Sequence, residues 1–152
     1  MVLKPEFVVL DEPTSALDPT ARAEIIDLLI RLQKELNTAY LFISHDLSTV
    51  RYLSHRVAVM YLGKIVEYTD KKTLFTNPQH PYTEALLSAV PIPDPTVRRK
   101  KTILQGDVPS PINPPPGCHF HTRCPYAEER CRAEEPPLTE FGPDHLVSCH
   151  LR

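Results

Sequence analysis

Residues 7–18 of this 152-residue chain read FVVLDEPTSALD, and this stretch decides the fold class. The first four residues are apolar, and an uninterrupted apolar run of this length is typical of a buried central strand. The run ends on two adjacent carboxylates, Asp11 and Glu12. Because neighbouring strand residues point to opposite sides, the two can divide the work of one site. One can hold Mg²⁺ through its water shell, and the other can orient or deprotonate a water molecule.

The residues that follow predict a helix and a second strand. Asp18 can cap a helix that begins at Pro19, apolar side chains recur at helical spacing as far as Leu36, and Asn37 can end the helix. Residues 40–44 read YLFIS, which is again an apolar run of strand length. A strand, a helix and a strand in this order predict a βαβ unit with parallel strands.

Three polar side chains are expected to meet where these strands end. Asp11 and Glu12 end the first strand, and His45 follows the second. Ligands of parallel sheets gather beyond the carboxyl ends of the strands. A histidine there can hydrogen-bond a terminal phosphate and help to hold a water molecule in line with Glu12. Taken alone, a histidine in this place would more often have a structural role, and the spacing of His45 after residues 11–18 is what favours contact with the phosphate.

The rest of the chain predicts a second, different pattern. Residues 56–62 and 65–68 read as a β-hairpin with Gly63 in its turn, and short helices are expected around residues 70–75 and from Pro81 onward. Residues 91–117 are rich in proline and have no periodicity, which indicates a linker or an extended arm.

The overall prediction is an α/β fold in three parts, namely a βαβ unit plus hairpin, a helix with a Pro-rich linker or arm, and a small Pro/Cys-rich extension. We place their boundaries at residues 1–76, 77–117 and 118–152.

Four cysteines in the last part are spaced C-x5-C-x6-C-x17-C, namely Cys118, Cys124, Cys131 and Cys149. Four thiolates can hold one zinc ion or a four-iron four-sulfur (4Fe-4S) cluster. The absence of a tight C-x2-4-C pair makes the cluster the preferred reading and zinc the alternative, with free or disulfide-linked thiols as a third possibility. The few large apolar residues of this part give it little core, so that a metal would be needed to stabilise it.

Residues 7–18 resemble the Walker B motif and D-loop of ATP-binding-cassette (ABC) ATPases, and residues 42–46, FISHD, resemble their switch-histidine loop. Residues 60–67, MYLGKIVE, and 77–87, NPQHPYTEALL, are similar to the C-terminal part of the ATP-binding subunits of dipeptide, oligopeptide and nickel importers. The cysteine region is similar to their C-terminal extension, and this likeness also points to the cluster.

The resemblance implies roles for the residues of the first part. Glu12 would be the general base of ATP hydrolysis, His45 would sense the γ-phosphate, and Asp11 would hold Mg²⁺ through water. Ser15 and Asp18 of the D-loop would contact a second ATPase subunit. The further partners implied are membrane-spanning permease subunits and, indirectly, an extracytoplasmic solute-binding protein.

Composition is compatible with this reading. The net charge of −2 gives no basic field for nucleic acid, and no apolar run approaches the length of a membrane span or a secretory signal. A cytoplasmic protein, attached to the inner face of the plasma membrane through its partners, is expected.

The sequence also departs from the family. It contains no G-x-x-x-x-G-K followed by Ser or Thr, and no LSGGQ-type signature. We therefore expect this chain to carry the acid–base residues of an ATPase site without the residues that bind the nucleotide, and to be inactive by itself. The alternatives are a stand-alone metal-binding or redox module, and an interaction module that docks on a full-length ATPase.

Overall fold

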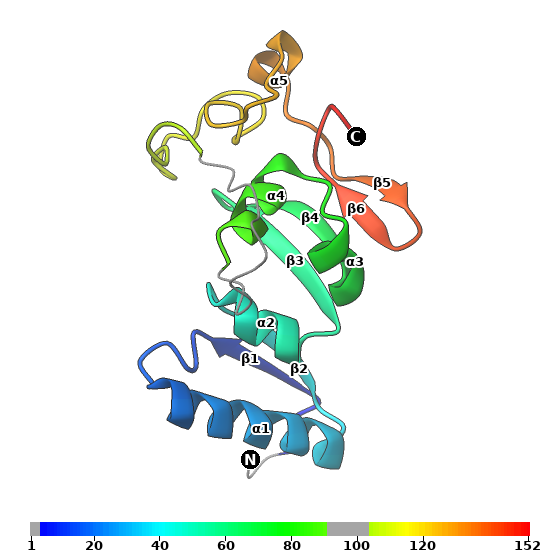
Figure 1. The fold of residues 1–152 in the computed structure, drawn as a ribbon. Helices are drawn as coiled ribbons and strands as arrows, with labels where there is room; N and C mark the ends of the chain where they lie inside the picture. The colour runs from blue at the N-terminus through cyan, green and yellow to red at the C-terminus, as the bar shows by residue number, and fades with distance from the viewer. Residues whose placement is uncertain (1–3, 91–103) are drawn as a thin grey trace, which may run out of the picture. The chain divides into compact units, whose positions relative to one another are not determined.

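The computed structural model describes residues 4–90 and 104–152, and the chain divides into two compact units, Met1–Ser54 and His55–Arg152. The fold is mixed α/β, with a parallel sheet in the first unit and an antiparallel sheet in the second (Figure 1). Residues 91–103 of the predicted linker lie outside the described residues, and residues 104–117 contain no helix or strand.

The first unit is the predicted βαβ unit. Its elements are β1 (Phe7–Asp11), α1 (Pro19–Leu36), β2 (Ala39–Ile43) and the short α2 (Leu47–Leu53). The two strands are parallel and pair from Phe7 opposite Ala39 to Asp11 opposite Ile43. Both strands therefore end side by side, which brings the residues that follow them to one edge of the sheet.

Local signals set the ends of α1. The Asp18 carboxylate accepts from the backbone N–H groups of Thr20 and Ala21, at 2.9 and 3.1 Å, and Pro19 needs no such partner. Asn37 ends the helix in the left-handed conformation, with φ of 50°. The predicted helix bounds are thus confirmed.

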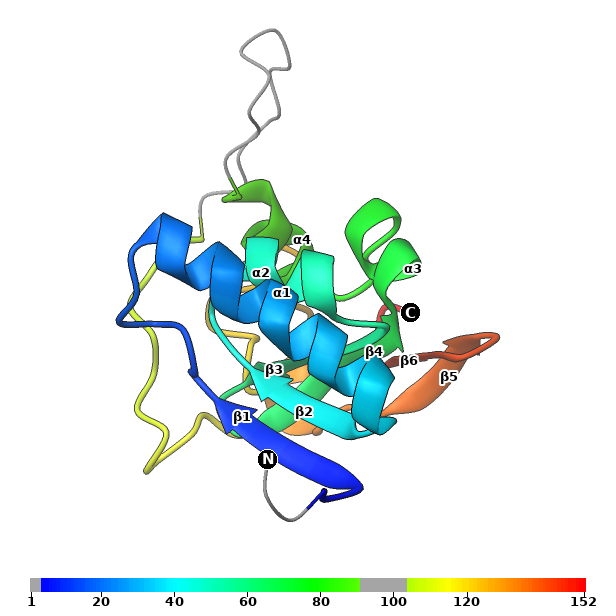
Figure 2. The ribbon, with the colours of Figure 1, turned by 90° about the horizontal axis from the view of Figure 1, so that it is seen from below.

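The prediction that residues 7–10 form a buried central strand is wrong for the chain as described. Phe7 and Val9 are 57% and 53% exposed, and Leu41 and Ile43 of β2 lie on the same face with 48% and 44% exposure. Helix α1 lies along the two strands (Figure 2), and within the first unit these four side chains have no such cover. A continuous apolar run is typical of a strand that is covered on both faces, whereas the first unit covers only one face of this two-stranded sheet.

The second unit begins with the predicted hairpin. Strands β3 (Arg56–Tyr61) and β4 (Lys64–Asp70) pair antiparallel, and the turn residues Leu62 and Gly63 both have positive φ, 43° and 78°. Two positive φ angles suit the right-handed twist of a two-residue hairpin, and glycine adopts one of them without strain. Helices α3 (Lys71–Thr76) and α4 (Pro81–Ser88) follow. In and just after α4, Leu87 is buried, whereas Leu86 and Val90 are half-buried.

Three further elements of this unit were not predicted from the sequence. They are α5 (Glu129–Ala133), β5 (Thr139–Gly142) and β6 (His145–Val147). The last two form a hairpin, and β6 pairs with β4, so that the sheet order is β3-β4-β6-β5. The C-terminal residues thus extend the sheet that the β3–β4 hairpin begins. Within residues 4–90 and 104–152, no helix has both the length and the apolar character that a membrane span needs.

Candidate active site

Glu12 and His45 form the centre of the candidate site, at the edge of the sheet where β1 and β2 end. One carboxylate oxygen, Oε1 of Glu12, accepts from Nδ1 of His45 at 2.8 Å and from the backbone N–H of His45 at 3.0 Å. The His45 side chain is 81% exposed and that of Glu12 is 36% exposed. When Nδ1 donates to Glu12, the other ring nitrogen, Nε2, is left for a ligand.

The backbone holds Glu12 in an uncommon conformation. Its φ is 44°, in the left-handed region that residues other than glycine, asparagine and aspartate rarely adopt. Its N–H donates to the carbonyl of Ile43 at 3.0 Å, which continues the β1–β2 ladder by one residue. Strained backbone of this kind clusters at functional sites, because the surrounding structure has to hold it there.

The remaining predicted residues of the first unit lie next to this pair along the chain. Asp11 is the last residue of β1 and is exposed. Ser15 donates from Oγ to the carbonyl of Glu12 at 3.0 Å, so its hydroxyl stabilises the loop of residues 13–18 that follows the carboxylates. Asp18 ends that loop as the N-cap of α1. The structure thus brings Glu12 and His45 into direct contact and connects Ser15 to Glu12 through the backbone.

The four cysteines are free and lie in the second unit, with Cys131 buried on α5. The backbone N–H of Cys118 donates to the carbonyl of Cys131 at 2.8 Å. Burial, with a smaller contribution from negative charge on the other three thiols, raises the pKa of Cys124 to about 11. Burial likewise raises the pKa values of Cys118 and Cys149. Even so, no three His, Cys, Asp or Glu side chains of the described residues are grouped as a metal ion would require. The side-chain arrangement therefore does not support the predicted metal site.

A buried polar cluster of the second unit was missed by the sequence analysis. Glu67 is fully buried on β4 and accepts from the backbone N–H groups of Gln79 and His80, at 2.8 and 2.9 Å, and from Nε2 of His145 at 2.8 Å. His80 in turn accepts from the N–H of Tyr82 through Nδ1, as the N-cap of α4. A glutamate that directly follows two apolar residues of a strand, with two prolines around a histidine farther along the chain, is the signal that could have indicated this cluster.

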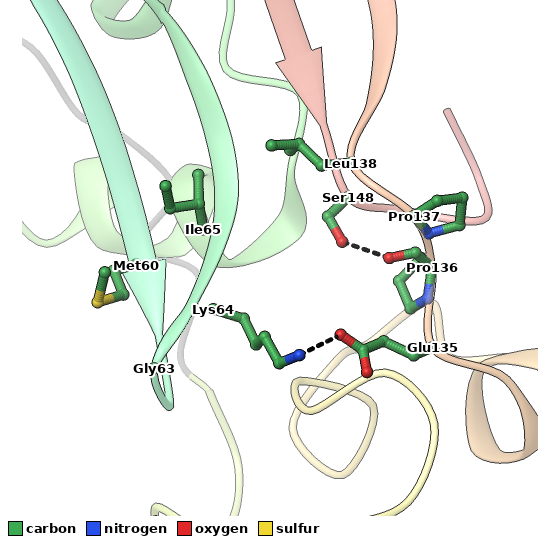
Figure 3. A pocket seen from close by; sticks show the side chains of 9 residues that line it. All are labelled: Met60, Gly63, Lys64, Ile65, Glu135, Pro136, Pro137, Leu138 and Ser148. Carbon is green, nitrogen blue, oxygen red and sulfur yellow. Dashed lines mark hydrogen bonds and ion pairs between the residues drawn. The ribbon is translucent and has the colours of Figure 1, made fainter.

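An open hollow of about 500 Å³ lies on the second unit (Figure 3). Its two polar contacts are the ion pair between Lys64 and Glu135, at 2.8 Å, and the hydrogen bond from Ser148 to the carbonyl of Pro136, at 2.7 Å. The other lining residues are Met60, Gly63, Ile65, Pro137 and Leu138. None of these residues was predicted to carry chemistry, and their polar groups are already paired with one another.

Comparisons with known proteins agree with the resemblance inferred from the sequence. The family described as the C-terminal region of oligopeptide/dipeptide transporters matches residues 66–131. A probable peptide ABC transporter ATP-binding protein of Sinorhizobium fredii is 53% identical over all of this chain, which covers 43% of that relative. The oligopeptide transport ATP-binding protein AppF of Bacillus subtilis is 53% identical over 99% of the chain, and 46% of AppF is covered. A putative peptide import ATP-binding protein of Brucella ovis is 51% identical over 98% of the chain, and 47% of it is covered.

The chain thus spans less than half the length of these relatives. The resemblance to the C-terminal part of the ATP-binding subunits of peptide-type ABC transporters is confirmed. The alternatives of a stand-alone metal-binding module and a separate interaction module are not favoured by these similarities.

Proposed function

We propose that this chain is the part of a peptide importer's ATP-binding subunit that supplies the general base and the phosphate-sensing histidine of ATP hydrolysis. The observation that carries the proposal is the contact of Glu12 Oε1 with both the ring and the backbone of His45. A carboxylate at a strand end, hydrogen-bonded to an exposed histidine, is suited to activate a water molecule next to a terminal phosphate.

The chemistry divides among three side chains. Glu12 accepts a proton from the attacking water, while His45 keeps the carboxylate oriented through Nδ1 and, in its imidazolium form, donates from Nε2 to the γ-phosphate. Asp11 is an exposed carboxylate at the same strand end, and an oxygen ligand of this kind suits Mg²⁺ bound through water. When bound, Mg²⁺ neutralises charge on the phosphates. Ser15 and Asp18 keep the loop of residues 13–18 in place, and in the complete subunit that loop would contact a second ATPase subunit.

The partners of the complete protein belong to the same proposal. The relatives are described as ATP-binding proteins of peptide transport or import. We expect the intact subunit to act at the inner face of the plasma membrane, together with permease subunits and a second ATPase subunit. A solute-binding protein outside the membrane would take part indirectly.

The proposal is tested with a chimera in which this chain replaces the matching 46% of AppF. We expect the chimera to hydrolyse ATP and the isolated chain to show no turnover, since the isolated chain carries no P-loop sequence. Replacement of His45 by Ala should reduce turnover by less than replacement of Glu12 by Gln, because a base contributes more than a group that positions it. Turnover that Glu12→Gln leaves unchanged would show that the general base has been assigned to the wrong residue.

We further propose that the four cysteines hold a 4Fe-4S cluster, with zinc as the alternative. The proposal is supported by the chemistry of the donor set, four free thiols that influence one another's ionisation. A single zinc ion needs sulfur atoms about 4 Å apart, given Zn–S bonds of about 2.3 Å, whereas the iron corners of a cluster hold their ligands farther apart. The described side chains are not grouped as one metal ion would require, and this finding therefore argues more strongly against zinc than against a cluster.

Anaerobic purification and metal analysis test this assignment. A brown protein with about four iron atoms per chain is expected, and Cys124→Ser or Cys131→Ser should remove the colour. Because burial raises the pKa of Cys124, the protein should lose metal more readily as the pH falls. A colourless protein with one zinc ion would overturn the cluster, and a protein without metal would overturn the site.

A further inference from the structure

Arg22 on α1 connects the loop of residues 13–18 to the residue after His45. Its Nη1 donates to Oδ2 of Asp46 at 2.9 Å, and its Nη2 donates to the carbonyl of Leu17 at 3.2 Å. The side chains of Arg22 and Asp46 are 32% and 29% exposed, so water screens this pair less than a fully exposed one. One guanidinium thus contacts both the loop and the start of α2.

Asp46 is itself held firmly. Its carboxylate accepts from the backbone N–H groups of Ser48 and Thr49 as the N-cap of α2, and from the hydroxyl of Thr49 at 3.0 Å. Partial burial acts to raise the pKa of Asp46, but these hydrogen bonds and the charge of Arg22 outweigh it and lower the pKa. The carboxylate is therefore ionised and available to Arg22 at neutral pH.

Backbone N–H groups connect Asp46 to the surroundings of His45. The N–H of Asp46 donates to Oγ of Ser44 at 3.1 Å, so the residues on both sides of His45 are joined across it. The N–H of His45, between them, donates to Glu12. A shift of Asp46 would therefore change the position from which His45 reaches the Glu12 carboxylate.

We propose that Arg22 is a positioning residue that couples the loop of residues 13–18 to the Glu12–His45 pair. If the loop is displaced by a partner, the displacement reaches His45 through the Leu17 carbonyl, the guanidinium and Asp46. This inference rests on the proposed function, since it assigns a means of regulation to the same site.

A simpler role for Arg22 is to hold α1 against α2, and the chain offers a matched control for that role. Tyr52 on α2 donates from its hydroxyl to Asp27 on α1 at 3.2 Å. This bond connects the same two helices but does not involve Asp46 or the loop. Tyr52→Phe removes it with little change in shape, and the variant reports the effect of losing one α1–α2 contact.

The first experiment records the imidazole NMR signals of His45 in this chain. Arg22→Gln should shift these signals, and Tyr52→Phe should leave them in place. Asp46→Asn keeps a good helix cap but removes the charge, so it should shift them in the same way as Arg22→Gln. The double variant should shift them no further, because both changes break the contact between Arg22 and Asp46 through which the effect reaches His45. Signals that respond equally to Arg22→Gln and Tyr52→Phe would overturn the proposal.

The second experiment measures ATP hydrolysis by the AppF chimera. Arg22→Gln should lower kcat by about tenfold to a hundredfold with little change in KM, as expected for a misplaced catalytic group, and Arg22→Lys should restore part of the rate. Tyr52→Phe should match the parent. If Glu12→Gln abolishes turnover while Arg22→Gln behaves like Tyr52→Phe, the positioning role is wrong and the proposed function stands. If Glu12→Gln has no effect on turnover, the proposed function is wrong, and the positioning role of Arg22, which rests on it, is wrong as well.

Discussion

Glu12 combines a left-handed backbone with a side chain whose Oε1 accepts twice from His45. The sequence predicted which residues meet, because two apolar runs joined by a helix must end at one edge of a parallel sheet. It could not predict that His45 uses Nδ1, or that Arg22 supports Asp46. Those contacts depend on side-chain rotamers and on the distance between α1 and α2, which residue spacing does not determine.

His80 leads to a prediction about pH. Burial lowers its pKa to about 4, from an ordinary value of 6.5, although the charge of Glu67 acts in the opposite direction. Its Nδ1 accepts from the N–H of Tyr82, which a protonated ring could not do. Since the folded pKa lies below the unfolded one, the neutral ring stabilises the fold above pH 6.5, and this contribution is lost as the pH falls toward 4.

The expected loss is about 3 kcal/mol between these two pH values. It is measured as the free energy of unfolding in urea at a series of pH values. His80→Asn retains a side chain that can cap α4 and removes the titrating group, so it should flatten this part of the profile even if it lowers stability overall. An equal slope for the variant and the parent would contradict the assignment to His80.

Secondary-structure elements with local signals were predictable, and those without them were not. Helix α1 has a capping aspartate and an asparagine end, and the β3–β4 hairpin has a glycine turn. Strands β5 and β6 have four and three residues, too few for an apolar pattern to emerge. Their place is set by pairing with β4 and by the contact of His145 with Glu67. Such long-range contacts are absent from any local stretch of sequence.

The β5–β6 hairpin should therefore depend on Glu67. In Glu67→Gln an amide NH₂ group replaces one carboxylate oxygen and therefore faces a hydrogen-bond donor. Depending on the orientation of the amide, that donor is the N–H of His80, or the N–H of Gln79 together with Nε2 of His145. Each buried group left unpaired costs about 1–3 kcal/mol. Amide hydrogen exchange should become faster at residues 145–147, while the exposed Glu140→Gln leaves it unchanged. Protection that persists in Glu67→Gln would show that other contacts hold the hairpin.

The exposed face of β1 and β2 differs from the buried central strand that the sequence predicted. The apolar run indicated cover on both sides of the strands, and the first unit by itself provides it on one. This chain matches less than half the length of its relatives, which are larger proteins with residues beyond the matched region. The boundaries proposed at residues 76/77 and 117/118 stay a prediction, as do the roles of the individual site residues.

In the proposed function, Glu12 acts on the attacking water and does not contribute to nucleotide affinity. The most direct test compares ATP affinity and single-turnover hydrolysis in the AppF chimera and its Glu12→Gln variant. We predict that the variant binds ATP as tightly as the parent and hydrolyses it at least about a hundredfold more slowly, because loss of a general base typically removes a factor of 10² to 10⁴. Weaker binding with an unchanged rate of hydrolysis for the bound nucleotide would contradict the account.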